Sequence, residues 1–207
     1  NRSLLGDNRT PTHFEKAAEK AVGNGFTTIK CAPFDEVTSD MKLEDIIAAS
    51  KTGLERVRAI RLSIGNNISI LVDCHSRFTL ETAPQICAEL ASLDVMWFEE
   101  PVAPETKSHE LSQIASVIDL PIAGGESGYG TPFFDNLMDK NALEIIMPDI
   151  KFCGGVNEAI NASLSASKRR KRFSLHNPSG PVSQLLSAHV TAAASDKISL
   201  AHSMPLE

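Results

Sequence analysis

The chain has 207 residues, 42% of them apolar, which is enough to bury one sizeable core. Its formal net charge of −6 argues against a broad basic surface for nucleic acid. No apolar run approaches the roughly 18 residues that a membrane-spanning helix needs, and the polar start NRSLLGDNRTPTHF lacks a signal-peptide core. Four cysteines without a CxxC pair suit free thiols in a reducing compartment. We therefore expect a soluble, cytoplasmic enzyme or binding domain that binds neither nucleic acid nor membrane.

Helical and strand-like patterns alternate along the whole chain. The first helix is predicted from a cap at Thr10 or Thr12 through Asn24, with apolar residues on one face and a glycine at its end. Strands are expected at residues 26–33, 68–75, 95–101, 121–126, 143–149, 172–177 and 197–203. Helices are expected between them at residues 43–65 (as one helix or two), 80–94, 109–119, 131–141, 156–171 and 183–196. Seven strands thus alternate with helices, which implies a parallel sheet with right-handed crossovers.

Five of these strands end in a polar residue of a catalytic kind: Asp73, Glu99, Glu126, Asp149 and His176. An open doubly wound sheet concentrates its site at one switch point, whereas a barrel collects functional groups from the carboxyl ends of many strands. The fold class predicted is therefore α/β, a (β/α)8-type TIM barrel. No GxGxxG or GxxxxGK[ST] follows any strand, which weakens nucleotide-binding alternatives.

The regular spacing argues for a single barrel domain over residues 1–207. Seven strands are one fewer than a complete barrel has, so we expect the first strand to be missing and the chain to be a fragment. An open barrel would expose a strand edge, which an upstream strand or another chain would have to cover.

Three of the polar strand ends, Asp73, Glu99 and Glu126, are carboxylates from consecutive strands. A buried, unpaired charge is costly and demands a partner, so a cation is expected among them. Hard oxygen ligands suit Mg²⁺, which keeps coordination positions for water or substrate. The sequence therefore predicts a magnesium site.

The segments VDCH, WFEEP, GGES, MPDIKFCGG and SLHNPSGPVS occur in this order and spacing. Together they resemble the barrel domain of the enolase superfamily, specifically its mandelate racemase-like subgroup, over essentially the whole chain. The resemblance implies that Asp73, Glu99 and Glu126 bind Mg²⁺ and that Asp149 and His176 form a dyad that removes the proton next to a substrate carboxylate. It also implies a homo-oligomer, and an α+β capping domain that does not lie in these residues.

The step that follows proton abstraction is suggested by two positions. Lys30 matches the first lysine of the Lys-x-Lys pair of mandelate racemase-type sites, whereas Ala32 stands at the second and cannot carry a proton. Racemisation and cycloisomerisation are therefore disfavoured. Asp73-x-His75 resembles galactonate dehydratase, in which the matching histidine protonates the departing β-hydroxyl. We expect β-elimination of water from an acid sugar, with Lys30 as a cation near the substrate carboxylate.

Several alternatives remain open on the sequence. His75 could orient Asp73 or substrate instead of acting as an acid. Lys151 could be structural or lie beside the substrate, and His202 could replace the glutamate that the subgroup often has where Ala201 stands. The protein could also be a racemase, epimerase or cycloisomerase of the same scaffold, or a truncated, non-catalytic barrel. Trp97 is expected to be a packing residue.

Overall fold

A computed structural model describes residues 9–38 and 40–195. The chain forms two compact units. The N-terminal unit comprises Asn1–Val102 and Val117–Leu120, and the C-terminal unit comprises Ala103–Ser116 and Pro121–Glu207. In the part of the chain that is described, no helix has the length and apolar character that crossing a bilayer requires. The prediction of a single barrel domain stays a prediction.

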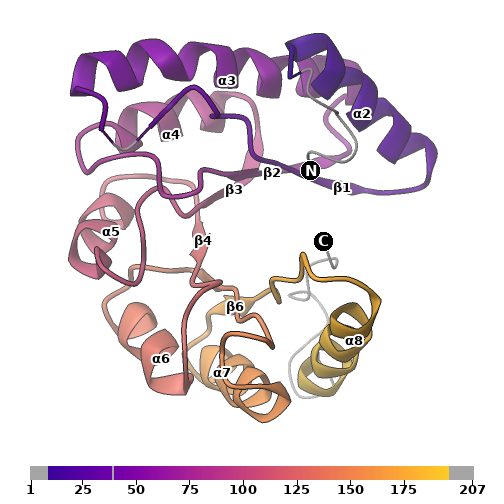
Figure 1. The fold of residues 1–207 in the computed structure, drawn as a ribbon, viewed down its shortest axis with the longest axis vertical. Helices are drawn as coiled ribbons and strands as arrows, with labels where there is room; N and C mark the ends of the chain where they lie inside the picture. The colour runs from indigo at the N-terminus through magenta and orange to yellow at the C-terminus, as the bar shows by residue number, and fades with distance from the viewer. Residues whose placement is uncertain (1–8, 39, 196–207) are drawn as a thin grey trace. The chain divides into compact units, whose positions relative to one another are not determined.

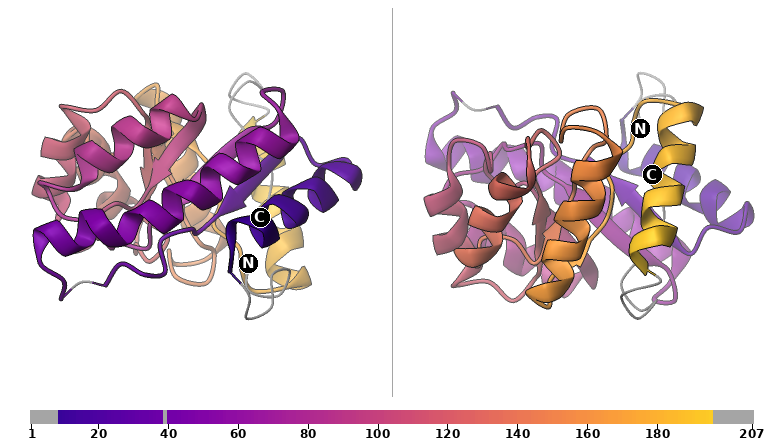
Figure 2. Two further views of the ribbon diagram at one scale, coloured as in Figure 1. Left: turned by 90° about the horizontal axis from the view of Figure 1, so that it is seen from above. Right: turned by 90° about the horizontal axis from the view of Figure 1, so that it is seen from below.

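The N-terminal unit alternates helices with parallel strands (Figure 1). Its elements are α2 (Pro11–Gly23), β1 (Thr28–Cys31), α3 (Leu43–Ile64), β2 (Ser69–Asp73), α4 (Ala83–Ser92) and β3 (Val95–Glu99). β2 lies between β1 and β3 and pairs with both in parallel. α2 and α3 pack side by side, as both ribbon figures show (Figures 1 and 2). The apolar side chains of the strands and helices form a core that includes Ile46, Val57, Ile70, Val72 and Phe98.

α3 is one continuous helix rather than two, and its last turn carries a buried arginine. The guanidinium of Arg61 donates hydrogen bonds to the carbonyl oxygens of Gly65 and Ile68 ahead of β2. It also donates to those of Leu93 and Asp94 ahead of β3. These bonds satisfy carbonyl groups just ahead of two strands, so the end of α3 holds the segments that lead into β2 and β3.

The C-terminal unit repeats the same alternation (Figure 1). Its elements are α5 (Ser108–Ala115), β4 (Ile122–Gly124), α6 (Thr131–Asp139), β5 (Ile145–Ile146), α7 (Val156–Lys168), β6 (Arg172–Phe173) and α8 (Pro181–Ser195). β5 pairs in parallel with both β4 and β6. The strands are short, but the pairing continues beyond them, because the N–H of His176 donates to the Pro148 carbonyl at 3.2 Å.

All the helices predicted from the sequence are present, as are the first six strands. The seventh predicted strand, at residues 197–203, lies outside the described residues, together with Ala201 and His202. The alternation of helices and strands could be predicted from the sequence, because each helix carries one apolar stripe and each strand is bounded by polar or glycine residues.

The four cysteines are all buried free thiols, as expected. Burial raises the pKa of Cys31 to about 12 and raises that of Cys74 well above its ordinary value. Because the thiolate is the reactive form of cysteine, burial lowers the reactivity of Cys31 and Cys74.

Candidate active site

Three of the predicted site residues, Lys30, Asp73 and Glu99, lie together at the carboxyl ends of β1, β2 and β3. β1 and β2 align Lys30 with Leu71, and β2 and β3 align Leu71 with Trp97 and Asp73 with Glu99. Alternate residues of a strand point to one face, so all five of these side chains share a face of the sheet.

This alignment depends on a β-bulge in β3. Ile70 pairs with Val95, but the next pair is Leu71 with Trp97, so Met96 is an extra residue without a partner in β2. A shift of one residue moves a strand's side chains to the opposite face. The bulge is therefore what sets Glu99 opposite Asp73.

Lys30 lies between the two carboxylates. Its Nζ is 2.5 Å from Oε1 of Glu99 and 3.4 Å from Oδ2 of Asp73. The side chains of Glu99 and Asp73 are only 1% and 6% exposed. Two buried negative charges so close together would repel strongly, and the ammonium group offsets that repulsion.

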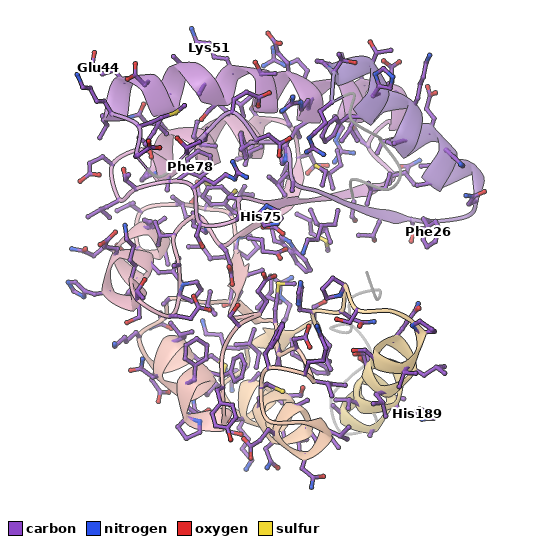
Figure 3. All side chains as sticks on the ribbon, in the orientation of Figure 1. Phe26, Glu44, Lys51, His75, Phe78 and His189 are labelled. Atoms are coloured by element: carbon purple, nitrogen blue, oxygen red, sulfur yellow. The ribbon has the colours of Figure 1, made fainter. Side chains whose placement is uncertain are left out.

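His75 contacts Asp73 twice. The backbone N–H of His75 donates to Oδ1 of Asp73 at 2.9 Å, and its ring Nε2 lies 3.2 Å from Oδ2. The strand predicted at residues 68–75 ends earlier, at Asp73, and a turn brings His75 back to Asp73. The side chain of His75 is 52% exposed and lies on the side of the strands away from α3 (Figure 3), so it is open to a ligand.

The Asp73 carboxylate is held in its charged form. Burial raises its pKa, but the hydrogen bond from His75 and the charge of Lys30 outweigh this effect and lower the pKa to about 2. Asp73 is therefore ionised at neutral pH, as a metal ligand must be.

The turn that carries His75 is fixed by a residue that the sequence did not single out, Arg77. Its Nη1 lies 2.6 Å from the carbonyl oxygen of Val37, and 3.1 and 3.2 Å from those of Asp35 and Phe34. His75 has a left-handed backbone with φ of 48°, which is unusual outside glycine and depends on surrounding contacts. The sequence feature that could have indicated this role is a long cationic side chain two residues after a candidate site histidine.

The C-terminal unit brings together the other three predicted residues, Glu126, Asp149 and His176. Nδ1 of His176 lies 3.0 Å from Oδ2 of Asp149, which is fully buried. Nε2 of the same ring lies 3.0 Å from Oε2 of Glu126. The second oxygen of Asp149 accepts the backbone N–H of Lys151 at 2.8 Å, so Asp149 itself is held in one orientation.

Glu126 reaches this position after a glycine pair that ends β4. Gly125 has a φ of +94°, and a Cβ on it would lie 3.1 Å from the ring of Phe134. Glycine adopts such a backbone without strain, whereas a Cβ there would strain the backbone and press on the ring. This explains the second glycine of the GGE segment.

Lys151 is not part of the Asp149–His176 pair. Its side chain is exposed, and Nζ lies 4.4 Å from the centre of the Phe152 ring in a cation–π contact. Within the described part of the chain, the side chain of Lys151 therefore makes no ion pair with Asp149 or hydrogen bond with His176.

Comparisons with known proteins extend this picture. Residues 13–206 match the family model described as enolase C-terminal domain-like. The chain is 32% identical over 148 residues to a D-xylonate dehydratase of Haloferax volcanii, a match covering 71% of the chain and 35% of that protein. It is 28% identical over 166 residues to a D-galactonate dehydratase of Xanthomonas euvesicatoria, a match covering 80% of the chain and 42% of that protein.

Among solved structures, a putative dehydratase from Salmonella enterica serovar Typhimurium aligns with a TM-score of 0.86 at 23% identity. That alignment covers all of the chain and 53% of the Salmonella protein, and at this identity it speaks for the fold alone. The chain spans less than half the length of these two curated relatives. The family model covers most of the chain and agrees with the alternation of parallel strands and helices, so this protein belongs to the enolase C-terminal domain-like family and has its α/β barrel-domain fold.

Proposed function

We propose that the complete protein is a Mg²⁺-dependent acid-sugar dehydratase. The observation that carries the proposal is the pair formed by His176 and the fully buried Asp149, an imidazole held for proton transfer. The curated relatives described above are dehydratases of acid sugars, which favours this class of reaction. The substrate would be a small acid sugar bound through its carboxylate.

Asp73, Glu99 and Glu126 are the proposed Mg²⁺ ligands. The donor set fits this ion, because all three are carboxylates, and Mg²⁺ prefers oxygen ligands. In the N-terminal unit, the buried pair Asp73 and Glu99 already has a cation, Lys30, beside it. When bound, Mg²⁺ would supply positive charge to the substrate carboxylate and thereby make the α-proton more acidic.

His176 is the proposed general base. Nε2 faces Oε2 of Glu126 at 3.0 Å, a contact that Glu126 would give up as a metal ligand. A proton on Nδ1, donated to Asp149, then leaves the lone pair of Nε2 to accept the α-proton of the substrate. The electron pair of the broken C–H bond moves into the carboxylate and gives an enediolate. Lys30 would add positive charge near the developing oxyanion.

His75 is the proposed general acid of the second step. The enediolate electrons form a double bond between the α- and β-carbons while the β-carbon–oxygen bond breaks, and the hydroxide leaves as water with a proton from His75. The enol that results tautomerises to a 2-keto-3-deoxy acid. The exposed imidazole of His75, hydrogen-bonded through Nε2 to the ionised Asp73, suits a group that must reach a substrate.

Racemisation is the weaker candidate on the same scaffold. It needs a second acid or base on the opposite side of the substrate, and the position that would supply one is Ala32. Lys30, two residues earlier, is bound to Glu99. A homo-oligomer remains part of the proposal.

The test is to incubate the complete protein with Mg²⁺ and a panel of acid sugars and to detect 2-keto-3-deoxy products with semicarbazide. Solvent deuterium exchange at the α-carbon is measured in parallel. His176→Asn should abolish both product and exchange. Glu44→Gln is the control, because Glu44 points outward from α3 (Figure 3) and should leave both unchanged. Wild-type protein with neither product nor exchange would overturn the proposal.

A further inference from the structure

Trp97, the single tryptophan of the chain, makes a polar contact that packing alone does not require. The indole is buried at 1% exposure, two residues before Glu99 on the same face of β3. Its Nε1–H donates to Oε2 of Glu99 at 3.1 Å. A buried indole needs some acceptor, but here the acceptor is one of the proposed metal ligands.

The two oxygens of Glu99 are thus held by two different groups. Oε1 is 2.5 Å from the ammonium of Lys30, which stands at the end of a flexible chain. Oε2 is fixed by a rigid ring system that is itself packed in the core. Rotation of a glutamate carboxylate about its last bond is intrinsically broad and roughly two-fold, so only its partners determine its plane. Trp97 is the partner that cannot move away.

The bulge at Met96 sets the register of this contact against β2. It aligns Trp97 with Leu71 and, two residues later, Glu99 with Asp73. A single irregularity therefore fixes which β2 residues lie beside Trp97 and beside Glu99. Phe98, between them in sequence, points to the opposite face by strand alternation and is also fully buried.

We propose that Trp97 is a positioning residue for the metal ligand Glu99, and that its indole N–H sets the affinity of the site for Mg²⁺. The inference rests on the metal site of the proposed function. Groups that hydrogen-bond to metal ligands orient them, and their loss lowers metal affinity by roughly 10–100-fold. Trp97 touches neither substrate nor metal in this assignment and acts only through Glu99.

The test is Mg²⁺ binding to the complete protein, measured by titration calorimetry without substrate. Trp97→Phe keeps an aromatic ring in the core but removes the donor, and we expect its Kd to rise by roughly 10–100-fold. Phe98→Leu is the matched control, because it also shrinks a buried ring of β3 but removes no hydrogen bond. We expect its Tm to fall while its Kd for Mg²⁺ stays at the wild-type value.

The outcomes separate the inference from the function on which it rests. An unchanged Kd in Trp97→Phe would overturn the positioning role while leaving the metal site intact. An equal rise in both variants would also overturn it, because lost packing would then be the cause. Wild-type protein that binds no Mg²⁺ would overturn the metal site and this inference with it.

Discussion

Lys30→Met removes the cation that lies between Asp73 and Glu99. The side chain keeps its approximate length and apolar stem but loses the ammonium group. In the folded protein this leaves two buried carboxylates facing one another, with Oε1 of Glu99 and Oδ2 of Asp73 deprived of a partner at 2.5 and 3.4 Å.

The size of the effect follows from burial. Removing one partner of a buried ion pair costs about 3–5 kcal/mol. Lys30 itself is 16% exposed, and its contact with Asp73 is longer than its contact with Glu99, so the lower figure of about 3 kcal/mol applies. A bound Mg²⁺ would restore the missing positive charge. Mg²⁺ binding to the variant should therefore be more favourable by about 3 kcal/mol. At about 1.36 kcal/mol for each tenfold change, this lowers the Kd for Mg²⁺ by about 100-fold.

Two measurements check this prediction on the complete protein. Thermal unfolding with a chelator should give a lower Tm for Lys30→Met than for wild type, and added Mg²⁺ should narrow the difference, because a ligand that binds only the folded state stabilises it. Calorimetry should give a lower Kd for Mg²⁺ in the variant. Lys51→Met is the control, because Lys51 is exposed on the outer side of α3 (Figure 3).

One result would refute the electrostatic reasoning. If Lys30→Met had the wild-type Tm in chelator and bound Mg²⁺ no more tightly, Lys30 would not be neutralising the two carboxylates. A weaker affinity would show that Lys30 orients Glu99 more than it repels the ion.

Three further predictions concern the dyad, the Asp73 carboxyl and the His75 turn. Asp149→Asn should slow α-proton exchange by about 10⁴-fold, the scale of the orienting aspartate in a serine-protease triad, as measured by solvent deuterium incorporation. The pKa of Asp73 is lowered from 3.8 to about 2, so its ionisation stabilises the fold by about 2 kcal/mol above pH 3.8, and this stabilisation is lost as the pH falls through about 2. The free energy of unfolding of Asp73→Asn, followed against pH, should lack this dependence. Parallel curves of unfolding free energy against pH for variant and wild type would contradict the prediction. Arg77→Ala should reduce elimination more than exchange, because it releases the turn that carries His75 but leaves His176 in place; an equal loss of both would argue for a general folding defect.

The order and type of the helices and strands followed from the pattern of apolar and polar residues alone. Polar residues at strand ends, such as Asp149 and His176, could be identified because each follows an apolar run and precedes a helix pattern. The proposed metal ligands were identified from the same spacing. The role of Lys30 as a counter-charge to Glu99 was not predicted. Lys30 was expected instead to be a cation near the substrate carboxylate.

The contacts between side chains, in contrast, depend on the three-dimensional fold. Trp97 was expected to be a packing residue, because strand alternation puts it on the same face as Glu99 but does not show that its indole N–H meets that carboxylate. The contact of Arg77 with the turn after β1 joins residues about 40 positions apart and depends on backbone carbonyls, which every residue type carries. Periodicity reports the face on which a residue lies, whereas register, turns and long-range hydrogen bonds determine the partner that it meets there.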